Sequence, residues 1–153
     1  SYSLYNRSLE GWYTENAGDE WNDSIATAMS VLTEESKLQE IVQLVGSDAL
    51  PEDQQLTLEV ARMLREFYLQ QNAFHDVDTY CTTQNQSKFL SVILHYKDLA
   101  EKAMSGGIEL EKVIGLPILE YIGRAKFEEN MVELLDKYDK SMTNDFAILM
   151  EEA

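Results

Sequence analysis

Apolar residues recur along most of the chain at spacings of three and four, the period of a helix with one buried face. The longest run starts at Asp19, which can cap a helix that reaches about Val45, and Gly46 follows as a stop signal. Pro51 suits the first turn of the next helix, whose pattern continues to about Asn72. We find no convincing strand, so the pattern predicts an all-α fold, a helical bundle.

The apolar stripes also predict which faces are buried. The first long helix carries two groups on one stripe: Trp21, Ile25, Ala28, Met29 and Leu32, then Leu38, Ile41, Val42 and Val45. The cleanest stripe lies between a threonine cap at Thr82 or Thr83 and the pair Gly106-Gly107, and consists of Phe89, Val92, Ile93, Tyr96, Leu99, Ala100 and Ala103.

Shorter helices are expected at both ends of the chain. A short opening helix is indicated within 4–13, another over 110–114, and a third after Pro117 with Ile118, Tyr121 and Ile122 apolar. A last helix follows residue 130. We expect one bundle domain over residues 1–127 and a helical tail over 128–153 that can pack on the same bundle.

Charge narrows the possible partners. The chain has 12 basic and 28 acidic residues, a formal net charge of −16. Such a surface repels nucleic acid and anionic lipid, and leaves basic protein partners open. No apolar run approaches the roughly 20 residues of a membrane helix, so we expect no direct membrane insertion. Because the chain begins with Ser1 and not with Met, we expect it to begin inside a larger protein.

The residues provide no self-contained active site. A Walker A loop, which cradles phosphate with glycines, lysine and serine or threonine, is absent. Cys81 is the only cysteine, and the histidines His75 and His95 are twenty residues apart, which does not make a zinc site. His75 with Asp76 and Asp78 offers too few ligands, so we predict no metal site and no catalytic residue.

Two loops remain as candidate working surfaces. The loop 46–53 is either an acidic knob that contacts a basic partner or a capped turn on a solvated surface. The loop 70–74 carries Phe74, which either stacks on a base or another ring or plugs the end of the bundle. The sequence pattern alone leaves both alternatives open.

Two runs of sequence carry a family likeness: LQEIVQLVGSDALPEDQQLTLEVARMLRE from Leu38, and LQQNAFHDVDTYC up to Cys81. Both resemble the C-terminal domain of the catalytic A subunit (alpha chain) of V-type and archaeal A-type rotary ATP synthases. The segments 1–5 and 89–95, and the stretch 116–126 that contains Ile122-Gly123-Arg124, resemble the same domain. The likeness covers residues 1 to about 127 and is most specific between Leu38 and Cys81.

The resemblance implies that ATP chemistry belongs to another domain of the same parent protein. In the family this all-α domain lies beneath a nucleotide-binding domain that carries the P-loop, and the parent protein binds ATP or ADP with Mg. The parent hydrolyses or makes ATP in a cytoplasmic, peripheral membrane complex that is coupled to proton transport. Its partners are the B subunits and the central-stalk subunits. The present chain lacks the P-loop, so we expect it alone to be inactive and to hold no cofactor.

The resemblance also assigns roles to both loops. Residues Asp48, Ala49, Leu50, Pro51, Glu52 and Asp53 occupy the position of the acidic DELSEED loop of the F-type catalytic subunit, which implies contact with the central stalk. Since Ala49 and Gln54 replace acids there, we expect shape to matter more than charge. Phe74 matches the aromatic that borders adenine, with Tyr68, Gln71 and Asn72 nearby, while Phe67 replaces an acid of the family pattern.

Two other hypotheses compete with this one. The chain can instead be a free-standing acidic helical adaptor that binds a basic protein partner. A third interpretation makes it an enzyme in its own right that uses His75 and nearby acids.

Overall fold

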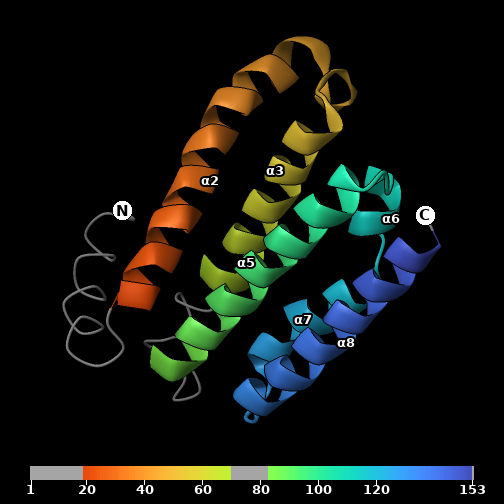
Figure 1. The fold of residues 1–153 in the computed structure, drawn as a ribbon. Helices are drawn as coiled ribbons and strands as arrows, with labels where there is room; N and C mark the ends of the chain where they lie inside the picture. Colours follow the sequence, from red (N-terminus) through yellow and green to blue (C-terminus); the bar gives the residue numbers. More distant parts are fainter. Residues whose placement is uncertain (1–18, 70–82, 153) are drawn as a thin grey trace.

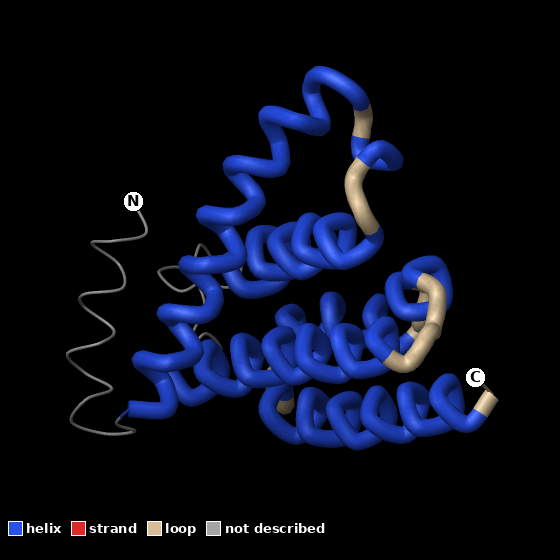
Figure 2. Tube along the Cα trace, turned by 45° about the horizontal axis from the view of Figure 1, so that its top comes forward, coloured by secondary structure: helices blue, strands red, loops and turns tan. Residues whose placement is uncertain are grey.

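The computed structural model describes residues 19–69 and 83–152, and every regular element in these two ranges is a helix. This confirms the all-α prediction. The expected opening helix within 4–13 and the candidate cap Thr82 lie outside the described residues. Figures 1 and 2 show helices stacked side by side, with one helical hairpin extending beyond the others.

That hairpin consists of α2 (Asp19–Val45) and α3 (Glu52–Met63), joined by a turn with one 3-10 segment, η1 (Ser47–Ala49). The bounds of α2 agree with the sequence prediction. The inner faces of the two helices pack through buried residues such as Ile25, Val31 and Val60. The end of the hairpin that holds η1 projects away from the rest of the bundle in Figures 1 and 2.

Beyond α3 the helix continues as a π-helical segment, η2 (Leu64–Leu69). The sequence did not predict this change, because the spacing of apolar residues does not distinguish a π-helical turn from an α-helical one. Arg65 near its start forms an ion pair with Glu35, which lies partway along α2. Such π segments are rare and often occur at functional sites.

The centre of the domain is α5 (Thr83–Ser105), whose predicted stripe is buried apart from the half-buried Leu99. It ends at Gly106-Gly107, where the positive φ of 100° at Gly107 suits glycine. Three short elements follow: α6 (Leu110–Ile114), α7 (Ile118–Arg124) and η3 (Ala125–Phe127). Tyr121, expected on the apolar side of α7, is instead exposed.

The final helix, α8 (Met131–Glu151), lies along α5 and beside α7 (Figure 1). Its four buried residues belong to the same apolar cluster as α5: Met131, Leu135, Met142 and Phe146. Two polar links join α8 to α5, an ion pair between Lys88 and Asp136 and a 2.6 Å contact between His95 Nδ1 and Asp139 Oδ1. Within the described residues, no helix combines the length and the apolar character that a membrane span requires.

Candidate functional site

The tip of the hairpin is a tightly bonded turn. The amide of Gly46 donates to the carbonyl of Val42 at 2.8 Å, and the amide of Leu50 donates to the carbonyl of Ser47 at 3.1 Å. Gly46 has φ 88° and ψ 159°, a backbone conformation that is essentially restricted to glycine. Pro51 then caps α3 with its carbonyl, which accepts amides at 3.0 Å. The turn therefore has one well-defined shape.

One of the residues assigned to stalk contact requires a correction. Leu50 is only 5% exposed, because its side chain turns inward from the tip. The carbonyl of Leu50 also accepts a 2.8 Å hydrogen bond from the side-chain amide of Gln55. Leu50 therefore anchors the turn to α3 and offers no contact surface. The sequence prediction treated it as one of a row of loop residues, and such a row does not reveal which side chain points inward.

The remaining residues of the predicted contact are exposed: Asp48, Ala49, Pro51, Glu52 and Asp53. Among them, Glu52 already has an internal partner, since its Oε2 accepts a 3.2 Å hydrogen bond from the amide of Leu110. Leu110 is the first residue of α6, so this carboxylate caps the start of that short helix. Glu52 thus joins the hairpin to α6, while Asp48 and Ala49 form the outermost part of the turn.

The structure adds an apolar surface that the sequence prediction placed in the core. Leu44 is 85% exposed and Val45 is 63% exposed, and Ile41 is also exposed, although the prediction put Ile41 and Val45 on the buried stripe. The stripe contains buried residues as far as Leu38, whereas Ile41 and Val45 at its end are exposed. Leu44 lies off the predicted stripe, and this was the one signal in the sequence for an exposed apolar surface. We call Ile41, Leu44 and Val45 the tip patch.

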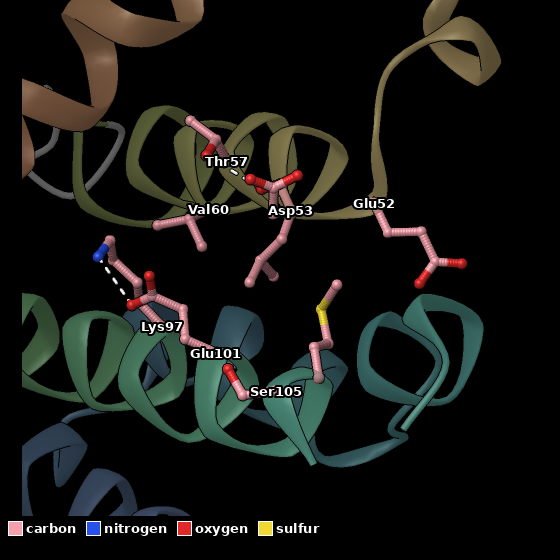
Figure 3. A pocket seen from close by; sticks show the side chains of 9 residues that line it. Glu52, Asp53, Thr57, Val60, Lys97, Glu101 and Ser105 are labelled. Carbon is pink, nitrogen blue, oxygen red and sulfur yellow. Dashed lines mark hydrogen bonds and ion pairs between the residues drawn. The ribbon is translucent and has the colours of Figure 1, made fainter. Parts of the chain in front are cut away.

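A groove with acidic residues on its rim separates α3 from α5 near the tip (Figure 3). It has a volume of about 390 Å³, and its floor includes the buried Leu56 and Val60. Asp53 lines it from α3, and Glu101 from α5 is paired with Lys97 at 2.9 Å. The described lining contains no histidine or cysteine, and its hydroxyl groups come from Thr57 and Ser105.

The residues predicted for the adenine side fall at the edge of the described chain. The backbone of Tyr68 is part of η2, but Gln71, Asn72, Phe74 and the side chain of Tyr68 lie outside the described residues. The neighbouring Phe67 is described and is buried, with its ring centroid 6.2 Å from that of Phe89. The aromatic that replaces an acid at position 67 is therefore a core residue.

The described residues also contain no cluster of His, Cys, Asp and Glu that could hold a metal ion. His95 is engaged with Asp139 of α8, and the group His75, Asp76 and Asp78 lies outside the described ranges.

Comparison with known proteins places these features in a family context. Residues 10–114 match the family described as the C-terminal domain of V and A type ATP synthase. The chain is 46% identical to the A subunit of the A-type ATP synthase of Methanopyrus kandleri, over 100% of its own length and 26% of that protein. It is 46% identical to the protein of the same name from Natronomonas pharaonis, covering 94% of the chain and 25% of the relative.

A bacterial relative matches over nearly the same extent. The V-type ATP synthase alpha chain 1 of Clostridium tetani is 44% identical over 99% of the chain and 26% of that protein. The chain thus spans about a quarter of the length of the curated relatives it matches. Because these matches extend beyond residue 114, they also include α7 and α8.

Proposed function

Because the chain belongs to the family of C-terminal domains of V- and A-type ATP synthases, we propose that it transmits torque between a nucleotide site and a central stalk. In this proposal it is the C-terminal domain of a catalytic A subunit, whose larger part carries the P-loop. The parent protein hydrolyses or makes ATP with Mg, next to B subunits in a cytoplasmic, peripheral membrane complex. The complex couples this reaction to proton transport.

The observation that carries the proposal is the projecting tip of the hairpin (Figure 2), which carries the exposed tip patch. Leu44 and Val45 are large apolar residues at the outermost end of a hairpin, and exposed apolar patches commonly mark sites of protein contact. Asp48 and Asp53 lie close to them in the chain, and the last turn of α2 contains no basic residue. The matching partner is a helical surface with apolar side chains flanked by Lys or Arg.

The construction of the hairpin suits the transfer of force. Arg65, just beyond α3, pairs with Glu35 partway along α2, while the glycine-only geometry of Gly46 and the rigid ring of Pro51 define the tip. An arm with ordered turns at one end and a packed base at the other moves as a unit. In this proposal, a push at the tip patch reaches α5 and the core through the packed helices.

The other end of the same arm leads to the proposed adenine side. The helix formed by α3 and η2 runs from the tip to Leu69, and Gln71, Asn72 and Phe74 follow directly in the chain. We propose that Phe74 stacks on adenine, with Tyr68, Gln71 and Asn72 close to the base. Nucleotide binding at one end of this helix and stalk contact at the other then share one rigid element.

The proposal assigns the chemistry to the larger part of the parent protein. The catalytic residues and the Mg ligands belong to the nucleotide-binding domain, so the 153-residue chain alone is inactive. It contributes the adenine side of the pocket and the stalk contact, and no residue of it acts on phosphate.

Site-directed cross-linking tests the stalk contact. Ala49→Cys places a thiol at the exposed tip, and Ile148→Cys places one at an exposed position on α8 as the control. In the intact complex, a short bifunctional reagent should join the tip thiol to a central-stalk subunit, and the control thiol should not react with that subunit. Cross-links from the tip only to proteins outside the complex would contradict the proposal and favour a free-standing adaptor.

A further inference from the structure

A second groove lies on another part of the domain and has the opposite character to the tip. It runs between the end of α3 and the segment that comprises α6, α7 and η3, and its volume is about 710 Å³. Its lining includes three basic residues, Arg62, Arg124 and Lys126, and one acidic residue, Glu120. Basic residues outnumber acidic ones in this lining, whereas the whole chain has 12 basic and 28 acidic residues. We call this the basic groove.

Apolar side chains make up much of the rest of the basic groove. Phe127 is 62% exposed and Ile114 is also exposed, while the buried Phe67 forms part of the floor. Together these residues give the groove an apolar surface beside its cationic side chains. The combination of an apolar floor and cations is typical of a surface that binds an amphipathic segment.

The three cations are not equivalent. Arg62 is held by Glu59 at 2.5 Å and by Glu66 at 2.6 Å, and the hydrogen bond with Glu59 is the main reason why its pKa is raised. Lys126 donates to the carbonyl of Glu66 at 2.9 Å, and burial lowers the pKa of its ammonium group. These two side chains are therefore largely committed to the domain itself.

Arg124 is the cation best placed to receive a partner. Its guanidinium lies over the ring of Tyr121, 4.9 Å from the centroid, and no carboxylate of the described residues forms an ion pair with it. A cation–π contact of this kind leaves N–H groups of the guanidinium available to bind a carboxylate through two parallel hydrogen bonds.

We propose that the basic groove is a second docking surface, which binds an acidic segment with a large apolar side chain from a neighbouring subunit of the same complex. A carboxylate of that segment binds Arg124, and its apolar side chain packs against Phe127 and Ile114. The inference uses the proposed function only to place the partner in the complex. The groove is separate from the tip, because Arg62 is ten residues beyond Glu52 on α3, about 15 Å along the helix axis.

Charge disfavours two alternative occupants, a polyanion and a second copy of the domain. A polyanion such as nucleic acid meets the field of a domain with a net charge of −16, which opposes its approach. A second copy of the domain brings the same charge and is repelled for the same reason. A short peptide with one or two carboxylates is repelled far less and gains the local contact with Arg124.

The test uses the intact complex with a photo-reactive residue in the groove. Phe127→p-benzoylphenylalanine should cross-link, on illumination, to an acidic segment of another subunit that mass spectrometry identifies. Combining it with Arg124→Glu should lower the yield of this cross-link about tenfold or more, since the paired charge is then repulsive. Lys140→Glu, the same kind of charge reversal at an exposed position of α8, is the matched control and should leave the yield unchanged.

Other outcomes would overturn the inference. These are cross-links confined to the same chain, cross-links only between two copies of this protein, or an equal yield with and without Arg124→Glu. The thermal midpoint of each variant shows whether it is folded, and Arg124→Gln replaces Arg124→Glu if the latter is not. A tip variant such as Leu44→Ser should not change this cross-link, so failure of the groove and failure of the proposed stalk contact give different results.

Discussion

The ring of Phe67 occupies the space beside Gly123 where any other residue would carry its Cβ. A Cβ built on Gly123 would lie 2.8 Å from Cε1 and 2.9 Å from Cζ of Phe67. The same ring also packs against Phe89, so it has little room to withdraw. The close approach of α7 to η2 therefore depends on a glycine at position 123.

Gly123→Ala should destabilise the domain by about 1–3 kcal/mol, the usual range for overpacking a core. Urea unfolding of the 153-residue chain measures the change. Gly106→Ala is the control, because a Cβ there would have no neighbour closer than 3.4 Å. Combining Gly123→Ala with Phe67→Leu should recover part of the loss, and equal effects of the two glycine variants would refute this packing argument.

Tyr96 should make stability depend on alkaline pH. Its hydroxyl is buried and donates a 3.1 Å hydrogen bond to the carbonyl of Val113, and burial raises the pKa of the phenol well above its ordinary value. The folded state therefore retains a proton that the unfolded state loses above about pH 10. The stabilisation is complete below about pH 10 and is lost as pH rises, with a slope of up to about 1.4 kcal/mol per pH unit.

Tyr96→Phe separates this contribution from that of the lysines, which titrate in the same range. The variant should lose about 1–3 kcal/mol at neutral pH, because the carbonyl of Val113 is left without its buried donor. Its free energy of unfolding should also fall less steeply between about pH 10 and pH 11. An unchanged slope in the variant would show that Tyr96 does not cause the alkaline loss.

Leu50 and Leu44 provide a matched pair near the tip. Leu50→Ala should lower the free energy of unfolding by about 2–5 kcal/mol, since the residue is buried and its removal leaves a cavity. Leu44→Ala should change it by less than about 0.5 kcal/mol, because that side chain is exposed. Thermal unfolding of both variants checks the correction to the role of Leu50, which fails if the two leucines cost the same.

Local patterns in the sequence predicted the bounds of the helices well and the contacts between helices less well. The bounds of α2, from Asp19 to Val45, agree with the signals that the sequence places at Asp19 and Gly46, because such signals act within a few residues. The contact of Glu52 with the amide of Leu110 could not be predicted, since it joins residues that are 58 positions apart. The inward turn of Leu50 and the π-helical turns of η2 likewise depend on tertiary packing.

The candidate sites likewise combine features that local sequence predicts with features that depend on the tertiary structure. The resemblance pointed to the loop 48–53 but not to Leu44, whose exposure depends on how far the hairpin projects from the bundle (Figure 2). Arg62 and Arg124 belong to distant parts of the sequence, so no motif could have predicted the basic groove. The adenine-side role of Phe74 remains a prediction from the resemblance.

The coupling of ATP hydrolysis to ion transport in the intact complex tests the central proposal most directly. The variant Leu44→Ser with Val45→Ser removes the tip patch, and Ile148→Ser with Met150→Ser removes an exposed apolar pair on α8 as the control. If the patch pushes the stalk, the tip variant keeps hydrolysing ATP but transports fewer ions per ATP, while the control keeps the normal ratio. An unchanged ratio in a folded and assembled tip variant would contradict the account.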